Sequence, residues 1–243
     1  MSYDTYTQLK RRIAPGLRFN QEIYEDVVSA HVTRDTVWLD AGCGWHVFPA
    51  WREESEHEVT GRAKLVLGCD VDEVSVRQHR SIQRVSLADL SFLPIRTGSM
   101  DLVTCNMVVE HLESPESVFA EFARVLTRGG RLIVHTPNAW SHFVAGAKCV
   151  PKRFKTRLAQ RLDGRAANDI FPALYRANTT RRIRALMTKV GLREESLRML
   201  ASDATFATAH PALALAELAL IRLTLMDMFR GFRVSILASY AKP

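Results

Sequence analysis

The sequence predicts an α/β protein with a doubly wound, mostly parallel sheet of seven strands and a helical cap inserted over one edge. Two observations predict this class. Short, continuously apolar segments alternate with helical patterns through much of the chain, which is typical of parallel strands covered by helices on both faces. The length of 243 residues and the hydrophobic content of 47% also suit one such domain with a well-packed core.

The strand pattern occurs in seven segments, which are residues 36–42, 63–72, 84–90, 100–112 (running into a loop), 131–137, 193–200 and 233–243. Helical patterns separate them at residues 20–32, 50–59, 114–126, 179–192 and 210–229. Ser114 and Pro115 are typical of the cap and first turn of a helix. The segment 127–130, TRGG, is expected to end that helix, so that the fifth strand begins at residue 131.

The chain is expected to form a single domain with four parts. They are an N-terminal helical segment at 1–35, a ligand-binding core at 36–137, a basic helical insertion at 138–180, and C-terminal helices and strands at 181–243. The insertion begins where the alternation of strands and helices breaks, after Pro137. We expect it to lie over the carboxyl edge of the sheet and to shape an acceptor site there.

Composition excludes several classes. No run of 18 or more uncharged apolar residues appears, and the N-terminus lacks an apolar signal region. The four cysteines show no CxxC spacing, and Cys43, Cys69 and Cys105 lie in or beside apolar strands. They are therefore expected to be reduced and buried rather than to form disulfides or hold a metal. These features favour a cytoplasmic protein without a bound metal.

Charge is distributed unevenly along the chain. Residues 1–140 hold 15 Lys and Arg against 19 Asp and Glu, a balance of −4, whereas residues 141–243 hold 18 against 7, a balance of +11. Seven of these cations lie close together at 148–165 of the insertion: Lys148, Lys152, Arg153, Lys155, Arg157, Arg161 and Arg165. They form either a solvated helix face or a site for an anionic or membrane-associated acceptor.

The stretch LDAGCGWH, residues 39–46, indicates a ligand loop, because it follows the first strand of the predicted sheet. Ligands of open parallel sheets bind beyond the carboxyl ends of the strands. Gly42 and Gly44 match the start of a dinucleotide fingerprint, but its third glycine position holds Val47. No Gly-Lys-Ser/Thr follows, so the loop is also not a phosphate-binding P-loop.

Four motifs in order resemble the class I S-adenosylmethionine-dependent methyltransferases, specifically the small-molecule type related to ubiquinone and menaquinone methyltransferases. They are WLDAGCG, LVLGCDVDEVSV, ADLSFLPIRTGSMDLVTCNMVVEHL and EFARVLTRGGRLIVHTPN, within residues 36 to 137. This resemblance implies a Rossmann-like fold and S-adenosylmethionine as cofactor, with S-adenosylhomocysteine as product.

The resemblance also implies a set of cofactor-binding residues: Asp40, Gly42, Cys43, Gly44, His46, Asp70, Val71, Asp89, Leu90 and Asn106. The glycines let the backbone approach the cofactor. Asp70 would accept hydrogen bonds from both ribose hydroxyls, and Asp89 would contact the adenine amino group. Asp40 would interact with the methionine ammonium. Asp101 is expected to start a strand rather than to touch ligand.

His46 stands where the family has a third glycine. Two interpretations remain open. Its imidazole donates a hydrogen bond to the methionine carboxylate, or Trp45 and His46 simply pack the loop beneath the N-terminal helix. Glu110 and His111 pose a similar choice. His111 is a candidate general base, but shaping the loop beneath the cofactor is the favoured role.

The predicted reaction is methyl transfer to a small-molecule acceptor, with Tyr24, His142, Tyr175 and Arg176 as candidate acceptor-binding residues. The Asn/Asp-Pro-Pro-aromatic motif of enzymes that methylate base amino groups is absent, since CNMVVEHL stands in its place. This disfavours nucleic acid as a partner. The alternatives are a nucleic-acid or protein methyltransferase, or a non-catalytic cofactor-binding protein.

The helix predicted at 210–229 is apolar nearly all round, interrupted by Glu217, Arg222 and Asp227. Such a helix suits a homodimer interface, peripheral membrane contact or simple burial in the core, and core burial is the favoured interpretation.

Overall fold

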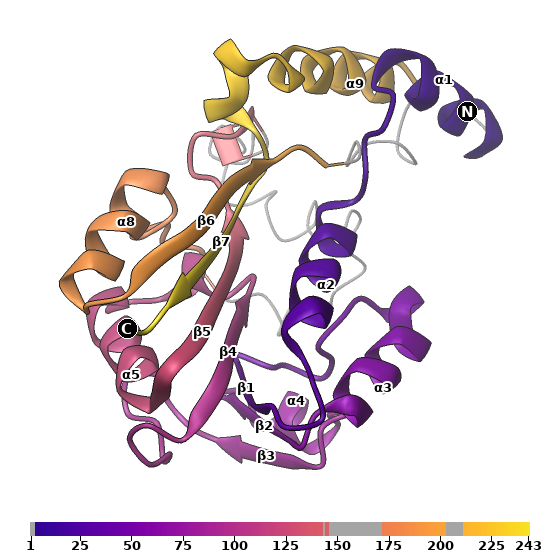
Figure 1. The fold of residues 1–243 in the computed structure, drawn as a ribbon. Helices are drawn as coiled ribbons and strands as arrows, with labels where there is room; N and C mark the ends of the chain where they lie inside the picture. The colour runs from indigo at the N-terminus through magenta and orange to yellow at the C-terminus, as the bar shows by residue number, and fades with distance from the viewer. Residues whose placement is uncertain (1–2, 143, 146–171, 203–210) are drawn as a thin grey trace.

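A computed structural model describes residues 3–142, 144–145, 172–202 and 211–243. Its centre is a single twisted sheet with the strand order β3-β2-β1-β4-β5-β7-β6 (Figure 1). The strands are β1 (Val37–Ala41), β2 (Leu65–Asp70), β3 (Arg84–Leu87), β4 (Met100–Asn106), β5 (Leu126–Pro137), β6 (Arg193–Leu200) and β7 (Ser235–Ala241). The predicted doubly wound, mostly parallel sheet of seven strands is confirmed, whereas the predicted helical cap stays a prediction.

The first five strands are parallel, and β7 pairs antiparallel with both β5 and β6. Strand order reverses at β1, which has β2 on one side and β4 on the other. The carboxyl ends of β1 and β4 therefore border the position where doubly wound sheets bind their ligands.

Helices cover both faces of the sheet (Figure 1). Their bounds are α1 (Tyr3–Ile13), α2 (Asn20–His31), α3 (Glu53–Arg62), α4 (Glu73–Arg77), α5 (Pro115–Val125), α8 (Thr180–Lys189) and α9 (Pro211–Leu225). Three short 3-10 turns are η1 (Ala50–Arg52), η2 (Val109–His111) and η4 (Asp227–Phe232). Helices α5 and α8 pack on one face, and α2 and α3 on the other.

Alternate strand residues belong to the two core layers, as the pleat requires. In β1, Leu39 packs with α5 and α8, whereas Trp38 packs with α2 and α3. In β5, Leu132 and Val134 join the first layer and Ile133 joins the second. Polar residues that share the pleat of Trp38 and Ile133 therefore lie beneath α2, which is where the candidate site is found.

The predicted boundaries need two corrections. The fifth strand does not begin at residue 131, because Leu126 already pairs with Met100 and the TRGG segment lies within β5. A register shift follows Met100, so the two glycines are accommodated as an irregularity in the ladder rather than as a turn. The third strand ends at Leu87, which leaves Asp89 in the loop beyond it.

The C-terminal helix corrects another interpretation. It ends at Leu225 and is followed by η4. Ala214, Leu218 and Ile221 pack on Tyr6 of α1. The opposite side of α9 is exposed, including Leu213, Leu220 and Leu223, so simple core burial accounts for only a minority of its apolar residues. Figure 1 shows α1 and α9 side by side at one end of the molecule.

No described helix is long and apolar enough to cross a membrane. Residues 146–171, which hold the seven cations at 148–165, lie outside the described residues. The four-part division of the domain therefore stays a prediction.

Candidate functional site

The ligand loop leaves β1 through two glycines in left-handed conformations. Gly42 has φ +75° and Gly44 has φ +53°, a region that residues with a Cβ rarely adopt. A Cβ on Gly42 would lie 2.3 Å from Cγ2 of Val108 in the loop after β4. The backbone nitrogens of Gly42 and Cys43 donate to the carbonyl oxygen of Cys69, at 2.7 and 3.2 Å. The loop is thus fixed against the ends of β2 and β4.

Asp70, the last residue of β2, connects this strand to the ligand loop. Its Oδ2 accepts a hydrogen bond from the backbone nitrogen of Gly44 at 2.8 Å, and its Oδ1 accepts one from the backbone nitrogen of Asp72 at 2.9 Å. Each carboxylate oxygen can accept a further hydrogen bond. Val71 follows with its side chain 56% exposed, so an apolar surface lies beside the carboxylate.

Asp40 is a buried carboxyl at the end of β1. Its Oδ1 accepts a hydrogen bond from the Thr104 hydroxyl at 2.6 Å, and that hydroxyl also accepts from Nε1 of Trp38 at 2.7 Å. Burial raises the pKa of Asp40 to about 7, and the nearby charges of Glu56 and Asp70 act in the same direction. An adjacent cation would favour the ionised form of this carboxyl.

Trp45 and His46 do not pack beneath the N-terminal helix. Both side chains are exposed, Trp45 at 47%, and their rings stack on each other with centroids 6.5 Å apart. The packing interpretation of these two residues is therefore wrong. Val47 and Phe48 are the buried residues of the loop. The contact predicted between His46 and a cofactor carboxylate stays a prediction.

A buried glutamate anchors the far end of the loop. Oε2 of Glu56 in α3 accepts from the backbone nitrogen of Phe48 at 2.9 Å. Arg80 forms an ion pair with the same carboxylate at 2.5 Å, and Ser81 donates to it. Burial opposes ionisation of Glu56, but these hydrogen bonds prevail and lower its pKa. The sequence analysis missed this anchor, since a Glu in a polar helix normally lies in solvent.

The predicted adenine contact lies beyond β3. Asp89 is exposed, and its Oδ1 accepts from the backbone nitrogen and hydroxyl of Ser91, both at 2.8 Å. These hydrogen bonds lower the pKa of Asp89. Leu90 contributes its side chain to the core, which leaves its backbone for any contact with ligand.

Asn106 ends β4 within a polar network. Its Nδ2 donates to Gln21 of α2 at 3.0 Å, and its Oδ1 accepts from Nδ1 of His135 at 2.8 Å. Nε2 of His135 lies 3.0 Å from the Ser235 hydroxyl of β7. Burial lowers the pKa of His135 to about 3. The sequence signal for this network is a histidine inside the apolar strand RLIVHTP, although His135 is not among the predicted site residues.

Tyr24 places a fully buried ring under α2, stacked on His135 at a centroid distance of 5.5 Å. Burial, and then the charge of Asp40, raise its pKa well above the usual value. Tyr24 therefore faces the polar network and the base of the ligand loop rather than solvent.

A second group of predicted residues gathers around Glu110. Nε2 of His111 lies 3.9 Å from the buried carboxylate of Glu110. The backbone nitrogen of Tyr175 donates to the backbone carbonyl oxygen of Glu110 at 3.1 Å. His111 Nδ1 lies 3.2 Å from the Pro172 carbonyl oxygen, and Arg176 donates to that of Glu113. These contacts support the loop-shaping role of His111.

His142 lies apart from both groups. It follows β5 and faces Glu217 of α9, with Nε2 of His142 3.8 Å from Oε1 of Glu217. The structure thus brings together Asp40, Gly42, Gly44, Asp70 and Val71 at the ends of β1 and β2, but not all the predicted acceptor residues. Cys43, Cys69 and Cys105 are buried and free, as predicted. Within the described ranges, no three His, Cys, Asp or Glu side chains group as metal ligands.

Comparison with known proteins agrees with this geometry. Residues 39–134 match the model of a methyltransferase domain family. A malonyl-[acyl-carrier protein] O-methyltransferase of Hahella chejuensis is 33% identical over 102 residues, which are 40% of this chain and 35% of that protein. A probable S-adenosylmethionine-dependent methyltransferase of Mycobacterium tuberculosis is 34% identical over 124 residues, 50% of this chain and 42% of that one. The chain thus spans less than half the length of these curated relatives.

Solved structures extend the likeness to the whole fold. A geranyl diphosphate C-methyltransferase from Streptomyces coelicolor superposes with a TM-score of 0.57 at 14% identity. The match covers 92% of this chain and 79% of the other. At such low identity the likeness shows the fold alone. Residues 39–134 thus match a methyltransferase domain family, and the described sheet and helices have the fold of such a domain.

Proposed function

We propose that this protein binds S-adenosylmethionine at the carboxyl ends of β1 and β2 and transfers its methyl group to a small molecule. The observation that carries the proposal is the position of Asp70. Its carboxylate accepts from the nitrogen of Gly44, which joins the acid of β2 to the glycine loop of β1. The family match over residues 39–134 supports the same cofactor.

The residues present fit this cofactor. Asp70 can accept hydrogen bonds from a ribose diol, while the exposed side chain of Val71 offers an apolar surface to the base. Burial raises the pKa of the Asp40 carboxyl, and an adjacent ammonium group would favour its ionised form. At Gly44 a Cβ would meet nothing within 4 Å, so open space borders the loop.

The main requirement of methyl transfer is the alignment of the two reactants. S-adenosylmethionine, when bound, would supply a methyl group on a sulfonium: the acceptor nucleophile would take the methyl group, and S-adenosylhomocysteine would leave with the electron pair of the broken C–S bond. The chain's own residues orient both reactants, and such positioning accounts for much of the barrier reduction in two-substrate reactions. A general base is required only where the nucleophile must lose a proton. The contacts of His111 with Glu110 and Pro172 do not assign it that role.

A small molecule is the proposed acceptor class. The support is the sequence CNMVVEHL after β4, which lacks the motif of base-amino methyltransferases. Tyr175 and Arg176 lie near Glu110 at the carboxyl edge of the sheet, and Tyr175 has a left-handed backbone with φ +53°. Such strain in a residue other than glycine is often found at functional sites.

Cofactor binding is tested with Asp70→Asn. Removing this charge should weaken S-adenosylmethionine binding about ten- to a hundredfold, because a hydrogen bond to a charged group contributes roughly 1.5–3 kcal/mol. Asp101→Asn is the matched control. Asp101 accepts from the nitrogen of Val37, at the start of β1 and thus at the opposite edge of the sheet. Calorimetry on both folded variants should separate them, and equal affinities would remove Asp70 from the site.

Turnover is tested separately with methyl-labelled S-adenosylmethionine. The protein is incubated with the small-molecule, protein and RNA fractions of a cell extract, and label should enter the small-molecule fraction. Label in RNA or protein would support the alternative acceptor classes instead. Cofactor binding without label in any fraction would favour a non-catalytic cofactor-binding protein.

A further inference from the structure

A cavity of about 420 Å³ lies between the segment that follows β5 and helix α9. It is lined by Ala139, Trp140, His142, Ala145, Leu220, Thr224 and Phe232. Its volume falls within the range of small-molecule sites, about 300–1,000 Å³. The polar side-chain groups of the lining belong to Thr224, His142 and the indole N–H of Trp140, and the Thr224 hydroxyl donates to the carbonyl oxygen of Ile221. Of these three, His142 is the one whose polar atoms are buried without a hydrogen-bond partner.

The imidazole of His142 is buried without hydrogen bonds. Neither Nδ1 nor Nε2 has a partner, and the side chain is only 18% exposed. Glu217 is too distant for a hydrogen bond, at 3.8 Å from Nε2. A neutral imidazole has one donor and one acceptor nitrogen. Leaving both unpaired in a buried position costs free energy, and native proteins usually satisfy such groups.

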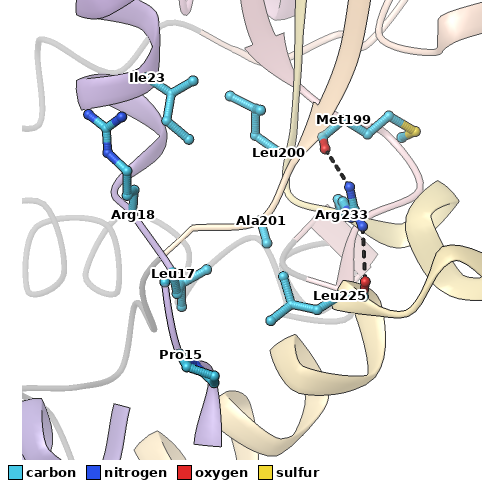
Figure 2. Close-up of a pocket in the computed structure, with 10 residues that line it drawn as sticks. Pro15, Leu17, Arg18, Ile23, Met199, Leu200, Ala201, Leu225 and Arg233 are labelled. Atoms are coloured by element: carbon cyan, nitrogen blue, oxygen red, sulfur yellow. Dashed lines mark hydrogen bonds between the residues drawn. The ribbon is translucent and has the colours of Figure 1, made fainter. Parts of the chain in front are cut away.

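A second cavity shows the opposite arrangement. It has about 210 Å³ and lies between the linker from α1 to α2 and the ends of β6 and α9 (Figure 2). Arg233 at its wall donates to the carbonyl oxygens of Thr224, Met199 and Leu225. The fold thus occupies the donors of Arg233, and the dashed lines of Figure 2 show two of these bonds. Arg18, the other charged residue of the lining, forms an ion pair with Asp26 at 2.7 Å. This cavity offers no comparable reason to bind a polar ligand.

We propose that the larger cavity binds an uncharged apolar small molecule that carries a hydroxyl group. The apolar walls take the hydrocarbon part. A hydroxyl both donates and accepts, so it can satisfy either nitrogen of His142. A carboxylate only accepts hydrogen bonds and would lose much of its hydration inside the apolar cavity. An ammonium group only donates and would lose hydration inside an apolar cavity.

The position of the cavity relates it to the rest of the molecule. Ala139 and Trp140 follow Pro137, the last residue of β5, and β5 runs parallel to β4. The cavity therefore opens from the same edge of the sheet as the ligand loop, on the side of β7. The inference goes beyond the proposed methyl transfer and does not depend on it, because binding is measured without cofactor.

The test compares three probes with one hydrocarbon chain. Binding of 1-hexanol, hexanoate and hexylammonium to the full chain is measured by NMR saturation transfer and calorimetry, at pH 7.5. We expect 1-hexanol to bind most tightly. Hexanoate or hexylammonium binding as tightly as 1-hexanol would overturn the preference for a hydroxyl group.

Three variants locate the binding. His142→Phe removes the imidazole and should weaken 1-hexanol about tenfold, the effect of losing one buried hydrogen bond. Leu220→Trp fills the cavity and should abolish binding of all three probes. Leu213→Trp makes the same change at an exposed position of α9 outside the cavity and should leave binding unchanged. Circular dichroism checks that each variant is folded. Unchanged 1-hexanol affinity in folded His142→Phe and Leu220→Trp would refute the site.

Discussion

Burial decides the charge of Asp40, and with it the expected pH dependence of cofactor binding. With its pKa near 7, the carboxyl is largely neutral at pH 5.5 and partly ionised at pH 7.2. Only the ionised form attracts the methionine ammonium. S-adenosylmethionine should therefore bind roughly tenfold more weakly at pH 5.5, as expected for one linked proton.

Adenosine provides the control for this pH effect, since it lacks the ammonium group and should bind equally at the two pH values. Asp40→Asn should make S-adenosylmethionine binding independent of pH in this range. Calorimetric affinities at pH 5.5 and 7.2 for both ligands decide the matter. A pH dependence that persists in Asp40→Asn would assign the titration to another group.

His46 supplies a second prediction at the scale of one residue. Its exposed imidazole lies on the ligand loop next to Trp45. If it donates to the cofactor carboxylate, His46→Ala should weaken S-adenosylhomocysteine binding by several-fold and leave adenosine unchanged, because adenosine has no carboxylate. Competition binding with the two ligands measures both effects. An equal loss for both ligands would place the contribution of His46 in the loop conformation instead.

At the scale of elements, one polar network ties four of them together beneath the ligand loop. Gln21 of α2, Asn106 of β4, His135 of β5 and Ser235 of β7 are joined by hydrogen bonds. Nδ2 of Asn20 in α2 also donates to Ser235 at 3.2 Å. Helix α2 is thereby fixed over the carboxyl half of the sheet, with the ring of its own Tyr24 buried against the sheet near Asp40.

Two buried groups in this region should affect stability in opposite directions as pH falls. Folded His135 resists protonation down to about pH 3, whereas an unfolded histidine takes up its proton near 6.5. Its contribution is complete above pH 6.5 and is lost as pH falls toward 3. Folded Asp40 is protonated below about pH 7, but the unfolded residue only below 3.8. Its contribution is complete below pH 3.8 and is lost as pH rises through 7.

Between pH 6.5 and 4 the two effects should largely cancel in the unaltered chain. Asp40→Asn removes one of them. The free energy of unfolding of this variant, relative to that of the unaltered chain, should then fall by about 1.4 kcal/mol per pH unit on acidification. Urea unfolding at pH 6.5, 5.5 and 4.5 measures the difference. A difference that does not change with pH would show that Asp40 is ionised in the folded protein throughout.

At the scale of the whole molecule, apolar and basic groups meet on α9. Leu213, Leu220 and Leu223 are exposed along one side of the helix, and Arg222 is exposed among them. Arg11 and Arg12 of the adjacent α1 are exposed as well. Exposed leucines flanked by cations are typical of helices that lie on anionic membranes, and two such faces would repel each other in a homodimer.

We therefore expect the protein to float with anionic phosphatidylglycerol vesicles at low salt and to be released as salt rises past ~0.1 M. Leu223→Gln should weaken flotation. Val74→Gln, an exposed position on α4, should not. Fluorescence anisotropy with generic RNA and DNA should show no strongly salt-dependent binding. A stable dimer in sedimentation that Leu223→Gln disrupts, without flotation, would identify a second copy as the partner of α9.

Much of the architecture could be predicted from sequence, because it follows from local patterns. Residues close together in the chain are enough to predict the apolar runs of β1, β2, β4 and β5. They are also enough to predict the glycines at 42 and 44 as a ligand loop. The position of Asp70, the acid that ends β2, could be predicted in the same way. The last residue of a parallel strand lies at the ligand-binding edge of the sheet whatever packs around it. Residues 39–134, which carry these signals, are also the part of the chain that matches a methyltransferase domain family.

Tertiary packing decided the remaining features, since they depend on residues distant in the chain. The pKa of Asp40 follows from burial among β4 and α2, the requirement for Gly42 from the side chain of Val108, and the anchoring of Phe48 from Glu56 and Arg80. The TRGG segment is part of β5 because Leu126 pairs with Met100 of β4, and this pairing outweighs the local tendency of TRGG to form a turn. The sequence by itself thus determined the order of elements and the position of the ligand loop. Only the folded structure determined which polar groups lose water, because desolvation depends on everything that packs around a group.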